Sequence, residues 1–194
     1  MHIKNKINNH YNYLINKFGK NKSGLGWKND GLNARYEIFY KNLNFKNKSV
    51  LDFGCGFCDL YFFLKKKVDL KDYVGFEINA KIINIINEKY KKIKIINKLS
   101  SLNKFDIIIS NGVHNFNYKH NRKVILSDLK KMIMISKYGF GISFINSDVD
   151  YTEKYLFYHN EKEIINFIKK NCKCSIKVDK SFSKFETFLI IKKK

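Results

Sequence analysis

The sequence has no proline, two alanines and only two arginines among its 38 basic residues. Its four cysteines are too few for a disulfide scaffold. No apolar run reaches the roughly 18 residues that a membrane-spanning helix needs. The first residues, MHIKNKINNHYNYL, lack the apolar region and small-residue cleavage site of an export signal. We therefore expect a cytoplasmic protein that does not associate with a membrane.

In contrast to these scarce residue types, positive charge is abundant. The net charge is +21, which suggests nucleic acid as a partner. Lysine carries nearly all of this charge, and abundant lysine, asparagine and isoleucine are typical of AT-rich codon usage. Arginine is the preferred residue for bidentate contacts with phosphate and guanine, and it is almost absent. The composition therefore favours a solvated lysine-rich surface over a nucleic-acid interface.

The length of 194 residues fits one domain, with a core large enough to fold without metal or disulfides. Residues 1–47 are polar, and their spacing predicts helices, including one over Leu32–Leu43. From residue 48 to residue 194, short apolar runs alternate with helical patterns. We expect a single domain, 1–194, with an N-terminal helical cap (1–47) and an α/β core (48–194).

Near-continuous apolar strands that alternate with helices are typical of a parallel sheet covered on both faces. The last two strands have no helix between them and should pair antiparallel at one edge. The predicted strands are Val50–Phe53, Tyr73–Glu77, Ile93–Ile96, Phe105–Ser110, Phe140–Ile145, Lys173–Val178 and Thr187–Ile191. The helices predicted between them are Phe57–Lys67, Ala80–Tyr90, Lys119–Ile135 and Glu161–Lys170.

The most informative segment is a glycine turn, VLDFGCGFCDL, in which a buried strand leads through Gly54 and Gly56 into a helix. Glycines let a ligand approach the backbone, and ligands of α/β sheets bind at the carboxyl ends of strands. Glu77 ends the next strand, where a carboxylate can accept hydrogen bonds from ribose hydroxyls. Asp59 replaces the third glycine of dinucleotide sites and disfavours a pyrophosphate. The turn predicts an adenosine-bearing ligand without a diphosphate; a purely structural turn is the alternative.

This segment resembles motif I of the class I S-adenosylmethionine-dependent methyltransferases, an apolar strand followed by D/E-x-G-x-G. Glu77 resembles their acidic ribose ligand, and Phe105–Gly112 resembles their fourth strand with the loop beside the methyl group. The front segment Gly24–Trp27, and later Phe144–Asp150, are similar to a bacterial subset of these enzymes. The resemblance implies a Rossmann-like seven-stranded sheet with the order 3-2-1-4-5-7-6, the last strand antiparallel and helices on both faces.

The resemblance also implies S-adenosylmethionine as the cofactor and a set of residues that bind it. Many members carry an acidic residue near the adenine after the third strand, whereas this chain has Lys98-Leu99-Ser100-Ser101 there. Arg35 could meet the carboxylate of the cofactor's methionine end, with a surface ion pair as the alternative. The implied cofactor-binding residues are Arg35, Asp52, Gly54, Cys55, Gly56, Glu77, Ile78, Ser100, Ser101 and Asn111.

Residues after the fourth strand should line the space where the methyl group is transferred. His114 is the candidate general base, because it titrates near neutral pH and follows a strand end. Asn115 is the second candidate catalytic residue, and His120 is a third polar group nearby. An exposed loop histidine and a turn-closing asparagine are the alternatives.

The cysteines allow a metal or redox interpretation, because Cys55 and Cys58 have the C-x-x-C spacing. They lie within the glycine turn, however, and Cys172 and Cys174 lie far away on a predicted edge strand. We interpret all four as small packed side chains and predict no metal site.

These observations predict an enzyme that transfers a methyl group from S-adenosylmethionine to a small polar metabolite. A sugar or sugar-linked compound is one candidate acceptor, since acidic and aromatic residues such as Asp148, Asp150 and Tyr158 follow the fifth strand. An RNA or protein methyltransferase is an alternative, although the absence of proline excludes the Asn/Asp-Pro-Pro-aromatic motif of base-amine methylation. A non-catalytic cofactor-binding protein of the same fold is another.

Overall fold

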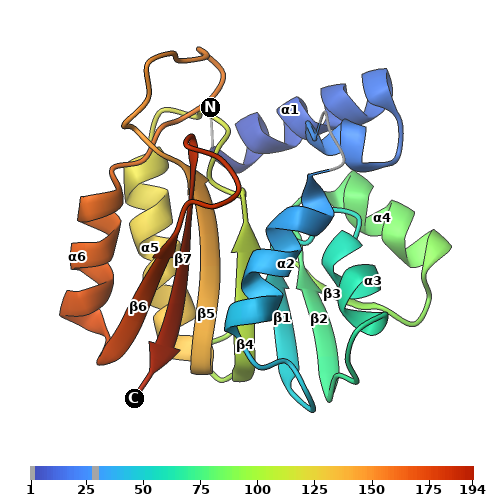
Figure 1. Ribbon diagram of the computed structural model, residues 1–194. Coiled ribbons are helices and arrows are strands. Elements are labelled where there is room, and N and C mark those ends of the chain that lie inside the picture. Colours follow the sequence, from blue (N-terminus) through green and yellow to red (C-terminus); the bar gives the residue numbers. More distant parts are fainter. Residues whose placement is uncertain (1–2, 28–30) are drawn as a thin grey trace.

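The computed structural model describes residues 3–27 and 31–194 of the chain, and Figure 1 shows their arrangement. The elements in chain order are α1 (Ile3–Phe18), a short 3₁₀ helix (Lys22–Leu25), α2 (Leu32–Asn42), β1 (Ser49–Phe53), α3 (Asp59–Lys65), β2 (Asp72–Phe76), α4 (Ala80–Lys89), β3 (Lys94–Ile96), β4 (Phe105–Asn111), α5 (Asn121–Ile135), β5 (Ser136–Ile145), α6 (Glu161–Asn171), β6 (Cys174–Asp179) and β7 (Glu186–Lys193).

The strands form one seven-stranded sheet with the order β3-β2-β1-β4-β5-β7-β6, which confirms the predicted Rossmann-like α/β fold. The pairs from β3 to β5 are parallel, and β7 runs antiparallel to both β5 and β6. Strand β5 begins at Ser136, four residues before the predicted start at Phe140. Lys137 and Tyr138 are exposed, so the strand has no apolar signature there.

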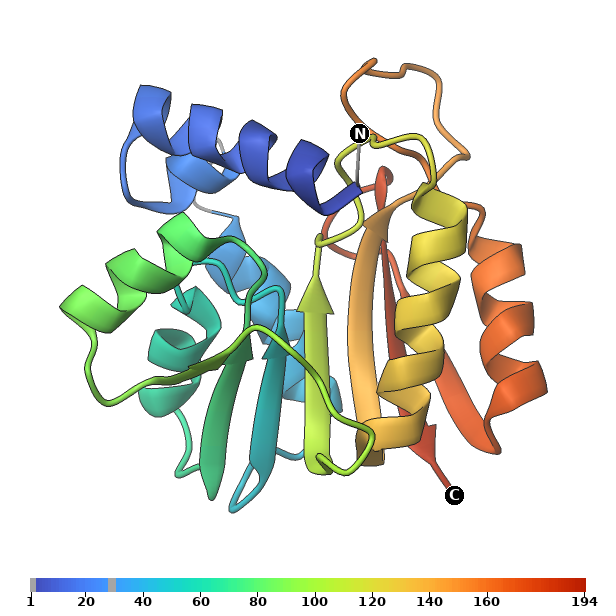
Figure 2. The same ribbon diagram turned by 180° about the vertical axis from the view of Figure 1, so that it is seen from behind.

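Side chains of successive strand residues point to opposite faces of the sheet and build two separate cores. In β4, Ile107 and Ile109 pack into the core under α2, α3 and α4, whereas Ile108 packs into the core under α5 and α6. Figures 1 and 2 show these two helical layers from the two sides of the sheet. The near-continuous apolar strands seen in the sequence are explained by this double burial.

The connection from β3 to β4, residues 97–104, contains no helix. Figure 2 shows this segment crossing the α5 side of the sheet as an irregular loop. The strands β2 and β3 are therefore covered on that side by a loop rather than by a helix layer.

Helix α1 lies across the carboxyl ends of the central strands, above the edge where α/β proteins bind ligands (Figure 1). Asn79, the residue that caps α4, anchors α1 because its side-chain amide donates to Asn8 O at 3.4 Å and to Asn12 Oδ1 at 3.0 Å. The ring of His10 stacks on Phe116, with 3.7 Å between the ring centroids. Among residues 3–27 and 31–194, no helix has both the length and the apolar character needed to cross a membrane.

Candidate cofactor and acceptor site

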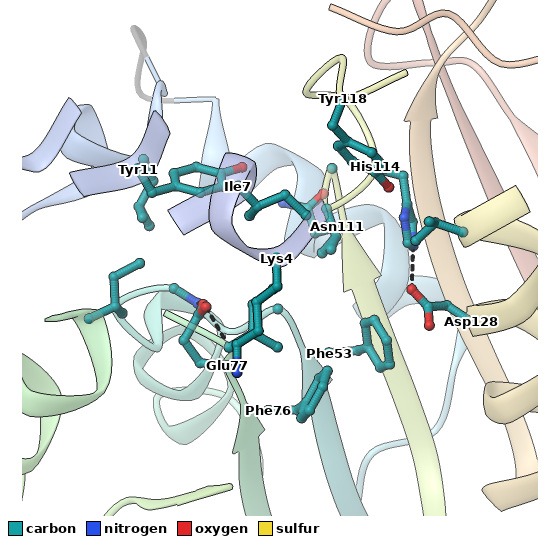
Figure 3. A pocket seen from close by; sticks show the side chains of 18 of the residues that line it. Lys4, Ile7, Tyr11, Phe53, Phe76, Glu77, Asn111, His114, Tyr118 and Asp128 are labelled. Carbon is teal, nitrogen blue, oxygen red and sulfur yellow. Dashed lines mark hydrogen bonds and ion pairs between the residues drawn. The ribbon is translucent and has the colours of Figure 1, made fainter. Parts of the chain in front are cut away.

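A cavity of about 330 Å³ lies between α1 and the carboxyl ends of β1, β2 and β4. Its size is at the lower end of the range of small-molecule sites. Figure 3 shows that side chains from α1, from the strand ends and from α5 point into it. The glycine turn, Glu77 and His114 all line this one space, so the structure brings together three parts of the predicted site.

The glycine turn requires its glycines for both conformation and space. Gly54 has φ +77° and Gly56 has φ +51°, a region that side chains other than glycine rarely adopt. A Cβ on Gly54 would lie 2.5 Å from Val113 Cγ2, and a Cβ on Gly56 would lie 2.4 Å from Leu25 Cδ1. The backbone N–H groups of Gly54 and Cys55 both donate to Phe76 O, which ties the turn to the end of β2.

Glu77 points toward the glycine turn and is buried. Its Oε1 accepts from the N–H groups of Ile78 and Asn79, both at 2.8 Å, and its Oε2 accepts from Gly56 N at 3.2 Å. Burial raises the pKa of Glu77, and these three backbone donors oppose that rise. Because a carboxylate oxygen can accept two hydrogen bonds, Oε2 retains capacity for one further donor on the cavity side.

Asp52 lies beneath the turn and is not among the residues that line the cavity. Its Oδ2 accepts a hydrogen bond of 2.6 Å from the hydroxyl of Tyr73. Burial raises the pKa of Asp52 to about 7, with Asp59 and Glu77 adding to the rise and Tyr73 opposing it. The structure thus gives Asp52 a partner within the protein core.

Four other residues predicted to bind cofactor also lie outside the cavity lining. Cys55 is buried against β2, and Ser100 and Ser101 are exposed on the β3–β4 loop. Arg35 pairs with Glu186 through two hydrogen bonds, its Nε donating at 2.8 Å. The predicted residues that do line the cavity are Gly54, Gly56, Glu77, Ile78 and Asn111.

Of the two predicted catalytic residues, His114 lines the cavity and is almost fully buried, whereas Asn115 does not line it. The Oδ1 of Asn115 accepts from Ile145 N at 3.1 Å, so Asn115 ties the loop after β4 to the end of β5. His120 is exposed at the position that precedes α5. The alternative of an exposed loop histidine therefore describes His120 and not His114.

The residues that α1 and α5 contribute to the cavity were not predicted from the sequence. Ile3, Ile7 and Tyr11 recur every four residues, a helical spacing that marks one face of α1. Tyr118 and Asp128 line the opposite side. Asp128 lies on α5, so its proximity to His114 depends on how this helix packs on the sheet, which no local pattern encodes.

The cysteines are free thiols, with Cys55 and Cys58 buried and Cys172 and Cys174 partly buried. Over the ranges that the structure describes, no three residues of the metal-ligating types gather closely enough to hold a metal ion.

Neither a family model nor a curated protein sequence matches the chain. Among solved structures, it is similar to magnesium protoporphyrin IX methyltransferase from Synechocystis PCC 6803 with bound S-adenosylmethionine, with a TM-score of 0.70, 13% identity and coverage of 100% of this chain and 98% of that chain. It is also similar to an S-adenosylmethionine-dependent methyltransferase from Clostridium acetobutylicum, with a TM-score of 0.63, 13% identity and coverage of 95% of this chain and 98% of that chain. A methyltransferase of the same kind from Aquifex aeolicus has a TM-score of 0.63 and 16% identity, with the same coverage of both chains.

These similarities extend over nearly the whole of both chains in each comparison. The protein has the fold of the class I S-adenosylmethionine-dependent methyltransferases. The helical segment before β1 is included in this likeness, since all of this chain is covered in the comparison with the Synechocystis structure.

Proposed function

We propose that this protein is an enzyme that binds S-adenosylmethionine in the cavity under α1 and transfers its methyl group to a small polar metabolite. The observation that carries the proposal is the position of Glu77, a buried carboxylate that faces the glycine turn inside a cavity of about 330 Å³. A turn without side chains beside a carboxylate suits a nucleoside, whose hydroxyls donate to the acid.

The residues present fit such a cofactor. The free acceptor capacity of Glu77 Oε2 suits a ribose hydroxyl, and Ile78 and Ile82 offer apolar surface next to it. Asp59 at the start of α3 is unfavourable for a diphosphate at the same turn. When bound, S-adenosylmethionine supplies an electrophilic methyl group, and the protein has to orient an acceptor toward it and exclude water.

A small polar acceptor is supported by the polar atoms that line the cavity without a partner in the protein. The hydroxyls of Tyr11 and Tyr118 make no hydrogen bond to any described residue, and both residues line the cavity. Figure 3 shows Tyr11 and Tyr118 beside the cavity, on either side of Asn111. These groups can donate to oxygen atoms of an acceptor such as a polyhydroxy compound.

Thermal unfolding with and without cofactor tests the proposal. A ligand at 100 times its Kd stabilises the folded state by about 2.7 kcal/mol, which shifts Tm by roughly 5–10 °C in a protein of this size. We expect S-adenosylmethionine and its demethylated product to give such shifts, and Glu77→Ala to remove most of them.

Glu88→Ala is the matched control, because Glu88 is an exposed carboxylate on α4. This variant should keep the full shift. No shift of the natural protein at millimolar cofactor, or an equal shift in the Glu77 variant, would contradict the proposal. Methyl transfer to small hydroxylated metabolites, followed with a radiolabelled methyl group, then tests the acceptor class.

A further inference from the structure

His114 lies at the end of the cavity away from Glu77 (Figure 3). Its backbone oxygen accepts from the side-chain amide of Asn121 at 3.1 Å and lies 3.0 Å from His159 Nε2. Asn121 is itself fully buried at the start of α5. The backbone of the loop after β4 is therefore tied at His114 to the start of α5 and to the segment before α6, and the imidazole is buried.

The two ring nitrogens of His114 have different surroundings. Nε2 is enclosed, has no hydrogen-bond partner and lies 3.9 Å from Asp128 Oδ2. Nδ1 forms no hydrogen bond with a described residue, and unlike Nε2 it is not fully enclosed. Since His114 lines the cavity, Nδ1 is the nitrogen that is left to face a bound molecule.

Asp128 projects from α5 with its carboxylate oriented by Lys131. The Nζ of Lys131 donates to Asp128 Oδ1 at 2.8 Å, so Oδ2 is the oxygen turned toward His114. The Asp128 side chain is 13% exposed, which weakens solvent screening between the two groups. All three residues line the same cavity.

Burial lowers the pKa of His114, with Lys131 adding to this effect and Asp128 opposing it. The other titratable groups that face the ring are His159, with 6.5 Å between ring centroids, and Tyr118, whose side chain lies beside it in Figure 3. Burial keeps the pKa of His159 low, at about 4, so His159 brings no positive charge near pH 7. The imidazole of His114 is therefore neutral near pH 7, and a carboxylate favours the tautomer whose proton points toward it.

We propose that Asp128 is a positioning residue that keeps the proton of neutral His114 on Nε2, so that Nδ1 faces the cavity as the base for the acceptor. The separation of 3.9 Å is longer than a hydrogen bond, and such contacts tighten when a substrate binds. Asp128 would orient His114 as the aspartate of a catalytic triad orients its histidine base.

This inference rests on the proposed function and narrows its acceptor to a hydroxyl compound. The acceptor oxygen forms a bond to the methyl carbon of S-adenosylmethionine while the bond from that carbon to sulfur breaks. The hydroxyl proton passes to Nδ1, and the carboxylate of Asp128 balances the resulting imidazolium. A carboxylate acceptor has no proton to lose and would gain nothing from this pair.

Nuclear magnetic resonance of the histidine rings tests the pair without cofactor or acceptor. Long-range nitrogen–hydrogen correlations distinguish the two neutral tautomers for each of the five histidines. We expect His114 to carry its proton on Nε2 in the natural protein. Asp128→Asn should lower the pKa of His114 further, and Lys131→Met should raise it.

Glu163→Gln is the control, since Glu163 pairs with Arg122 on the surface and should leave His114 unchanged. A proton on Nδ1 in the natural protein, or the same His114 titration in the natural protein and in Asp128→Asn, would overturn the proposal. If the Asp128 variant does not fold, an unchanged pKa of His114 in Lys131→Met would also contradict the proposal. These readings are independent of the cofactor-induced Tm shift, so failure of either proposal is recognised separately.

Discussion

The hydroxyl of Tyr73 donates to Asp52 Oδ2 at 2.6 Å, directly beneath the glycine turn. Both side chains are buried, and Asp52 is the acidic residue of the segment that resembles motif I. The pair connects β1 to β2, since Asp52 and Tyr73 lie on neighbouring parallel strands. This contact makes Asp52 a support for the backbone of the turn above it.

The raised pKa of Asp52, about 7, makes stability depend on pH. Between pH 4 and pH 7 the folded protein keeps a proton that the unfolded chain releases, so this group lowers the free energy of unfolding as pH rises. This fall in the free energy of unfolding amounts to up to about 1.4 kcal/mol per pH unit, and Asp52→Asn should abolish it. Urea unfolding from pH 4 to pH 8 should show the variant gaining stability relative to the natural protein as pH rises. A constant difference across this range would contradict the assignment.

Gly56 should not tolerate alanine, because the new Cβ would lie 2.4 Å from Leu25 Cδ1 at a φ of +51°. We expect Gly56→Ala to lower the free energy of unfolding by about 1–3 kcal/mol and to weaken cofactor binding. Gly26→Ala is a control with φ +83° but no atom closer than 3.7 Å, so it should cost only the backbone strain. Adding Leu25→Ala to Gly56→Ala should recover part of the loss; no recovery would exclude the steric explanation.

Asn12 should control how firmly α1 closes the cavity, since its Oδ1 accepts from Asn79 Nδ2 at 3.0 Å. Asn12→Ala removes that bond, whereas the capping bond in which Ile82 N donates to Asn79 Oδ1 remains. We expect faster amide exchange in residues 3–18 and weaker cofactor binding, with α4 unchanged. Asn9→Ala, at an exposed position of the same helix, should have neither effect.

Arg35 should stabilise the fold through Glu186 instead of binding cofactor. Its guanidinium also lies 4.0 Å from the ring centroid of Phe182 and 4.7 Å from that of Trp27. Arg35→Met should cost about 1–3 kcal/mol in urea unfolding because it leaves the carboxylate of Glu186 without its partner. The cofactor-induced rise in Tm should persist in this variant. Loss of this rise would indicate that Arg35 binds the cofactor.

The sequence by itself determined the sheet and the position of the turn. Alternation of apolar runs and helical patterns predicted seven strands because burial on both faces leaves a local signature. The start of β5 escaped prediction, since Lys137 and Tyr138 are exposed and lie where the pairing with β4 shifts register, so this part of the strand carries no apolar pattern. Glu77 could be anticipated because its place at the end of a strand follows from chain order.

Only the tertiary structure decided which side chains share the cavity. Arg35 meets Glu186, 151 residues away, and His114 meets Asp128 across the packing of a helix on a sheet. Helix α1 brings Tyr11 over the strand ends, whereas its helical periodicity predicts only that one face of the helix is apolar. Local periodicity fixes the direction of a side chain relative to its own element, whereas the partner of that side chain depends on how whole elements pack together.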